Sequence, residues 1–196
     1  MKHIDRDRLY TDIEYRFEYM CSFLDFGASD KALIVAAAPL LADQIPTIVD
    51  NVYGKLLKYD ILAASFMHRM QNYDGEVIRD LSQLNVNSEQ IKFRRSMLKR
   101  YLVCAMLGVN DMATLLQYLE WVSLIHTRNT SKHSSINVEY IHLGAMLSYI
   151  DLSIHAALTR LELPADTLTR TQAAFTKMFA LQNDLFALYY THGIYF

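Results

Sequence analysis

One histidine stands where its type and spacing could serve a metal. His126 follows Leu115, Leu119 and Val122 at steps of four, three and four residues, which is the spacing of one face of an α-helix. Asp111 lies just before this run and can cap the helix. His126 therefore ends an apolar stripe, immediately before the polar stretch 129–135.

A tyrosine shares the same kind of position on another predicted helix. Tyr53 lies beside the inward stripe formed by Ile45, Val49 and Val52. A haem pocket needs these two parts: a neutral imidazole holds the iron, and a hydroxyl on the opposite side donates a hydrogen bond to a bound gas. The alternative is that His126 is a hydrogen-bonded core residue and Tyr53 only fills space.

Motifs of other functional classes are absent from the sequence. None of the seven histidines forms an H-E-x-x-H pair, and no Gly-rich phosphate loop, G-x-S-x-G elbow or C-x-x-C pair occurs. Cys21 and Cys104 are far apart, and we expect two free thiols. The net charge of −2 gives no broad basic field for nucleic acid. We interpret the local basic cluster as a solvated helix face: Lys92, Arg94, Arg95, Lys99 and Arg100.

The spacing of apolar residues and the few turn formers favour long helices. Only six Gly and three Pro occur in 196 residues, of which 52% are hydrophobic, so one domain with a large helical core is expected. Thr11 and Glu14 match a capping box that would start the first helix. Pro39 and Pro46 predict kinks or boundaries. The expected helices cover about 11–26, 29–56 with those breaks, 58–66, 88–107, 111–126, 137–161 and 164–190, with an irregular stretch at 67–86.

Four segments together resemble the protoglobin and globin-sensor family. Residues 44–54 are similar to a helix of that family that ends in an aromatic pair before a glycine, and residues 122–128 to its Leu-x-His segment. Residues 138–143 and 163–166 are similar to the starts of its last two helices. Their order and spacing also agree, from about Tyr15 to the end of the chain.

The resemblance implies an all-α globin fold, a 3-over-3 helical sandwich with an extra N-terminal helical segment. We expect one domain over residues 1–196, with the extension in 1–28 and the globin core in 29–196. It also implies a homodimer formed through the last two long helices.

Carried over by position, the resemblance makes His126 the ligand of a haem b iron and Tyr53 the distal hydrogen-bond donor. Val52 stands where the family has a tryptophan, which removes a bulky side chain from the gas side of the pocket. The remaining cofactor-binding residues implied are Leu98 and Tyr101 on the distal side and Val138, Leu143, Met146 and Ile150 on the proximal side.

The other histidines are assigned weaker roles. His68 is either exposed or a sixth iron ligand, and His133, Arg128 and Lys132 either reach a haem propionate or are solvated. His142 and His155, 13 residues apart on one helix, face different directions and share no site.

The sequence thus predicts a cytoplasmic globin that binds O₂, CO or NO reversibly and acts as a gas binder or sensor, with signalling, if any, through a partner protein. No catalytic residue is identified, so any enzymatic activity would be haem-based. The alternative is a haem-free, dimeric interaction domain of the same fold. Neither nucleic acid nor a membrane is expected as a partner.

Overall fold

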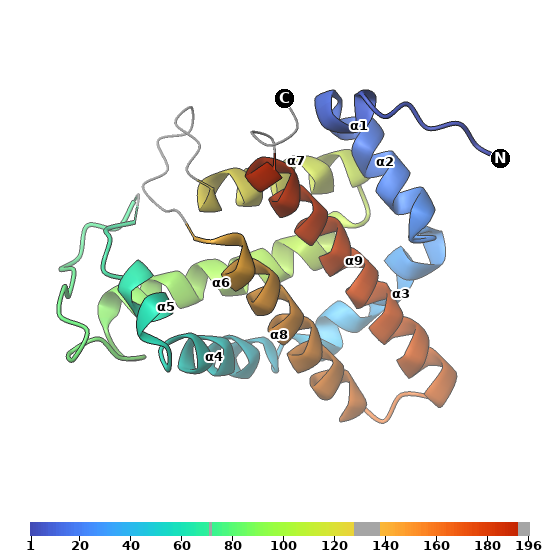
Figure 1. Cartoon of the computed structure of the whole chain (residues 1–196). Coiled ribbons are helices and arrows are strands. Elements are labelled where there is room, and N and C mark those ends of the chain that lie inside the picture. Colours follow the sequence, from blue (N-terminus) through green and yellow to red (C-terminus); the bar gives the residue numbers. More distant parts are fainter. Residues whose placement is uncertain (71, 128–137, 192–196) are drawn as a thin grey trace.

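A computed structural model describes residues 1–70, 72–127 and 138–191 of the chain, and within these ranges every regular element is an α-helix (Figure 1). The all-α prediction is therefore confirmed. The helices are α1 (Arg8–Thr11), α2 (Ile13–Phe23), α3 (Ala28–Leu41), α4 (Ile45–Leu56), α5 (Asp60–Ser65), α6 (Glu89–Gly108), α7 (Met112–His126), α8 (Tyr140–Thr159) and α9 (Ala165–Thr191).

The start of α2 differs from the predicted capping box. Asp12 is the N-cap, and its carboxylate accepts a hydrogen bond of 3.0 Å from the backbone N–H of Tyr15. Thr11 belongs to the short helix α1, and its hydroxyl donates to the carbonyl of Asp7. The hydroxyl is therefore used one turn upstream, and the neighbouring carboxylate caps α2 instead.

The two prolines have different effects on the backbone. Pro39 lies inside α3, which ends two residues later at Leu41. Pro46 occupies the first turn of α4, where the missing N–H costs no hydrogen bond. The axes of α3 and α4 meet at 88°, so the predicted boundary between these prolines is a sharp corner.

In its described residues, 66–70 and 72–88, the stretch between α5 and α6 has no regular helix, as predicted, and a side chain of α6 holds it in place. The buried Gln90 accepts a hydrogen bond of 2.6 Å from the N–H of Ile78 and donates to the carbonyls of Ile78 and Phe66. These bonds hold the stretch over the first turns of α6.

The long helix α9 organises the core. It contacts α2, α3, α7 and α8, while α6 contacts α3, α4 and α7, and α8 also contacts α4 (Figure 1). One hydrophobic cluster runs through all these contacts, with fully buried side chains such as Phe175, Phe186, Leu119 and Ile150. The result is a layered helical core in which α9 and α6 each contact several other helices.

One described helix, α8, is long and apolar enough to cross a membrane, and α3 with α4 would reach that length only if their 88° bend were ignored. A third of the apolar stretch of α8 is buried in the fold. A lone helix of this kind is a weak indication of a membrane span, because core helices share its length and composition.

Candidate functional site

The position of His126 is fixed by the helix that ends with it. Asp111 caps α7 through hydrogen bonds to the N–H groups of Ala113 and Thr114, as predicted. The ring Nδ1 of His126 lies 2.7 Å from the carbonyl oxygen of Val122, one turn earlier. That contact makes Nδ1 the protonated nitrogen of a neutral ring, so the lone pair of Nε2 remains available, as in many metal-binding histidines.

The surroundings of His126 keep its imidazole neutral. The ring meets the edge of Phe186 on α9 at a centroid distance of 5.7 Å and an interplanar angle of 83°. Burial lowers the pKa of His126; the hydrogen bond to Val122 opposes this effect, and the positive charge of Arg94 adds to it. A metal requires the neutral form, so the environment favours the state that can bind.

A buried polar network attaches α7 to α9 just behind His126. Gln182, which is fully buried, donates from Nε2 to the Ser123 hydroxyl at 2.9 Å and to the carbonyl of Leu119 at 3.2 Å. The Tyr190 hydroxyl donates to the carbonyls of His126 and Val138. These bonds fix both the end of α7 and the chain that enters α8.

Tyr53 lies on α4 with its side chain turned into the core. It is 8% exposed, and burial raises the pKa of its phenol to about 12. The hydroxyl is therefore protonated at neutral pH and can donate a hydrogen bond. The Tyr53 ring packs on that of Phe66, with centroids 5.7 Å apart, and Phe66 was not singled out from the sequence.

The two α6 residues expected on the distal side occupy different depths. Leu98 is half-buried against the core, and Tyr101 is buried. The Tyr101 ring stacks on Tyr118 of α7, with centroids 6.3 Å apart, and its burial raises the pKa of its phenol. Tyr101 is thus held between α6 and α7.

The four residues expected on the proximal side lie between the residues just before α8 and the middle of that helix. Leu143 and Ile150 are fully buried in the core, while Val138 and Met146 are half-buried against it. The fold therefore brings all nine predicted site residues into, or against, a single cluster. Their contact with a haem remains a prediction.

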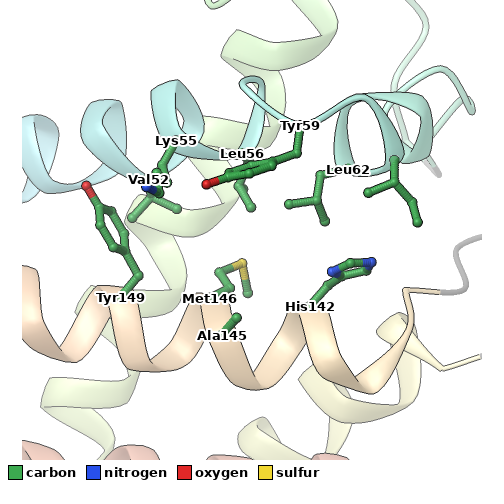
Figure 2. Close-up of a pocket in the computed structure, with 10 residues that line it drawn as sticks. Val52, Lys55, Leu56, Tyr59, Leu62, His142, Ala145, Met146 and Tyr149 are labelled. Atoms are coloured by element: carbon green, nitrogen blue, oxygen red, sulfur yellow. The ribbon is translucent and has the colours of Figure 1, made fainter.

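A cleft opens between α4 and α5 on one side and α8 on the other (Figure 2). Its volume is about 300 Å³, and Val52 and Met146 face each other across it (Figure 2). Val52 lines this cleft, whereas Tyr53, the next residue of α4, does not. Its labelled lining comprises Val52, Lys55, Leu56, Tyr59, Leu62, His142, Ala145, Met146 and Tyr149.

Arg94 corrects the interpretation of the basic cluster on α6. It was expected on a solvated face, yet its side chain is only 6% exposed. Its guanidinium lies 5.3 Å from the centre of the Phe66 ring and donates to the carbonyl of His68 at 2.7 Å. The sequence did contain a signal, because Arg94 precedes Leu98 and Tyr101 by four and seven residues and so shares their helix face.

None of the other histidines that the structure describes belongs to a group of metal-ligating side chains. His68 is exposed, in agreement with the simpler of its two interpretations. His133, Arg128 and Lys132 lie outside the described residues. Among the residues that the structure does describe, no three His, Cys, Asp or Glu side chains are grouped to hold a metal ion.

One imidazole is too few ligands for a bare ion, whereas haem supplies four nitrogens of its own and needs one from the protein. A neutral, half-buried imidazole, a protonated buried phenol and an apolar surround are the groups that a haem requires. The residues present therefore fit haem better than they fit a free metal ion.

The family model described as Protoglobin matches residues 13–193, which is nearly the whole chain. No curated protein matches it. The family match confirms the expected globin fold with an N-terminal extension.

Proposed function

Because the chain belongs to the protoglobin family, we propose that it is a haem b globin that binds O₂, CO or NO reversibly, with His126 as the protein ligand of the iron. Membership of this family indicates a haem globin with a gas-binding role. When bound, haem supplies an iron with an open coordination position for a diatomic gas. We expect it to act as a gas binder or sensor in the cytoplasm, with any signalling through a partner protein.

The observation that carries the proposal is the state of His126. Its Nδ1 is engaged by the Val122 carbonyl at 2.7 Å, and its Nε2 makes no hydrogen bond within the described part of the chain. Burial lowers its pKa, so the ring is neutral and Nε2 carries a lone pair at neutral pH. A histidine that served only the core would be expected to use both nitrogens.

On the opposite side, Tyr53 is the donor that this function needs. Its hydroxyl makes no hydrogen bond to a described residue, and its raised pKa keeps it protonated. It would orient a polar, iron-bound gas by donating to it. The apolar residues Val52, Leu98 and Leu143 would exclude water from the same region.

The test is an absorption spectrum of haem-supplemented protein, as isolated, after reduction and after addition of CO. We expect a Soret band that shifts with CO. In His126→Ala the band should be lost or become that of unligated haem, while the exposed histidine provides a matched control, His68→Ala, that leaves the spectrum unchanged. Full occupancy with an unaltered spectrum in His126→Ala would contradict the assignment.

Absence of any Soret band in the wild-type protein, even with ample haem, would instead favour the haem-free interaction domain. A spectrum altered by His68→Ala would show that the exposed residue reaches the iron as a sixth ligand. The two outcomes are separable because one concerns cofactor binding and the other coordination.

We also propose that two copies associate through α8 and α9. Ile141 and Leu152 are 71% and 65% exposed, and their spacing of eleven residues places them on one face of α8. Exposed apolar side chains aligned on a helix are typical of a subunit interface. Light scattering coupled to size exclusion should give twice the chain mass, and a mass near 22.7 kDa would refute the dimer.

A further inference from the structure

The cleft between α4 and α8 is formed by matching rows of side chains (Figure 2). The first row, from α4 and the turn after it, is Val52, Lys55, Leu56 and Tyr59, and the second, from α8, is His142, Ala145, Met146 and Tyr149. Both rows follow the i, i+3, i+4, i+7 spacing of one helix face. The two helices contact each other, and the small side chains of Val52 and Ala145 leave a trough between the rows.

Most of the surface of this cleft is apolar, and part of it is open to solvent. Its aliphatic and thioether side chains are Val52, Leu56, Ile61, Leu62, Ala145 and Met146. On the α5 side, Tyr59 and Ile61 are 48% and 59% exposed. Exposed apolar side chains around a concave site are typical of a place that binds a hydrophobic group.

One end of the cleft carries a positive charge that no carboxylate of the described residues pairs with. The Lys55 ammonium lies 5.7 Å from the centre of the Tyr59 ring, and the Tyr149 hydroxyl lies at the same end (Figure 2). No Asp or Glu is among the described lining residues. Asp60, which follows Tyr59 in the sequence, uses its carboxylate on the N–H of Ile61 at 2.7 Å. An anionic group would therefore complement this end of the cleft.

The opposite end of the cleft does not favour a second anion. His142 lies there (Figure 2), and its Nε2 is 3.3 Å from the carboxylate of Glu139. The neighbouring lining side chains, Ile61 and Leu62, are apolar. The polarity of the cleft thus runs in one direction, from a cation at Lys55 to an apolar end that already has a carboxylate.

We propose that this cleft binds straight-chain fatty acids of about eight to ten carbons, with the carboxylate at Lys55 and the chain along the trough toward Leu62. A packed heavy atom with its hydrogens takes roughly 30 Å³, the share of one water molecule in the liquid. The cleft of about 300 Å³ therefore accommodates about ten such atoms. This ligand is separate from the proposed haem, since neither His126 nor Tyr53 lines the cleft.

The experiment is a calorimetric titration of the full chain, in its haem-free and haem-loaded forms, with octanoate, decanoate and decylamine. We expect decanoate to occupy a single site and to bind about tenfold more tightly than octanoate, because each buried methylene contributes about three- to fourfold in affinity. Decylamine has the same chain length and the opposite charge, so it should bind roughly tenfold or more weakly than decanoate.

Three variants separate the head group from the chain. In Lys55→Gln we expect decanoate to bind roughly three- to tenfold more weakly, whereas the neutral 1-decanol should bind as it does to the wild type. The matched control is Lys58→Gln, because Lys58 is exposed and does not line the cleft; its decanoate affinity should equal that of the wild type. Ala145→Trp fills the trough and should abolish binding of both decanoate and 1-decanol, with an unchanged helical circular dichroism spectrum.

Several results would overturn the inference. Decanoate affinity unchanged in Lys55→Gln would remove the head-group site, and decanoate binding retained in Ala145→Trp would place the ligand elsewhere. Because Val52 and Met146 are also predicted haem contacts, loss of decanoate binding on loading with haem would assign the cleft to the haem. No binding of decanoate to the wild type would refute the site outright. A protein that lacks a Soret band but binds decanoate as expected would overturn the haem function and leave this inference standing.

Discussion

Removing the charge of Asp184 should show how firmly the N-terminal segment is attached to the globin core. Arg16 on α2 and Asp184 on α9 form a two-point contact, with Nε to Oδ2 at 2.7 Å and Nη2 to Oδ1 at 2.6 Å. Their side chains are only 13% and 16% exposed. The third nitrogen, Nη1, donates to the carbonyl of Leu9 at 3.0 Å, so the guanidinium is largely enclosed by protein.

The expected cost of Asp184→Asn follows from what remains after the substitution. The Arg16 charge would stay buried, and breaking one side of a buried pair typically costs about 3–5 kcal/mol. Since Arg16 keeps its bond to Leu9 and some solvent contact, we expect the low end, about 3 kcal/mol. For a chain of this length that corresponds to a fall in Tm of roughly 6–12 °C.

Urea unfolding followed by far-ultraviolet circular dichroism measures this loss. The control is Asp166→Asn, because Asp166 pairs with Arg170 on the same helix at 3.4 Å with side chains 81% and 55% exposed, and such surface pairs contribute at most about 1 kcal/mol. The double variant Arg16→Met, Asp184→Leu should recover most of the loss, because both charges are gone. A loss below about 1 kcal/mol in Asp184→Asn, or no recovery in the double variant, would refute the reasoning.

Three further predictions concern the site itself. Val52→Trp should narrow the cleft between α4 and α8 and slow CO association several-fold in flash photolysis; an unchanged rate would mean that gas enters elsewhere. Because burial lowers the pKa of His126 in the folded state, the unfolded chain takes up the proton first. Stability of the haem-free protein should therefore fall as the pH drops below about 6.5, and less so in His126→Leu, when urea unfolding is compared across pH; equal slopes would argue against a buried neutral ring. Asp111→Ala should cost about 1 kcal/mol by removing the cap of α7, measured by the same unfolding assay, and a variant as stable as the wild type would show that the cap is dispensable.

Local sequence patterns located the helices well because each pattern depends on only a few neighbouring residues. The carboxylate of Asp111 and the stripe from Leu115 to His126 define α7 without reference to the rest of the chain. The start of α2 was misplaced by one residue. There, Thr11 and Asp12 are both good capping residues, and only the backbone shows that Thr11 closes α1 while Asp12 adopts the extended conformation of an N-cap.

From the sequence, the candidate site was predicted only as apolar stripes on separate helices. The family resemblance was the reason to place these stripes around one pocket. The sequence did not predict that Val52 and Met146 face each other across a cleft. The two residues are far apart in the chain and come together only when α4 packs on α8. The same holds for Phe186, whose contact with His126 depends on α9. Packing between helices decided these neighbours.

The burial of Arg94 could not be predicted from the sequence of α6 alone. Its charge and its basic neighbours in the sequence indicated solvent, although its spacing from Leu98 and Tyr101 places it on their helix face. It is buried because the irregular stretch after α5 folds across the start of α6 and offers the carbonyls of Phe66 and His68. The sequence by itself determined the helices, the histidine stripe and the family resemblance. The tertiary structure decided which polar groups lose their water, since desolvation depends on the distant segments that cover them.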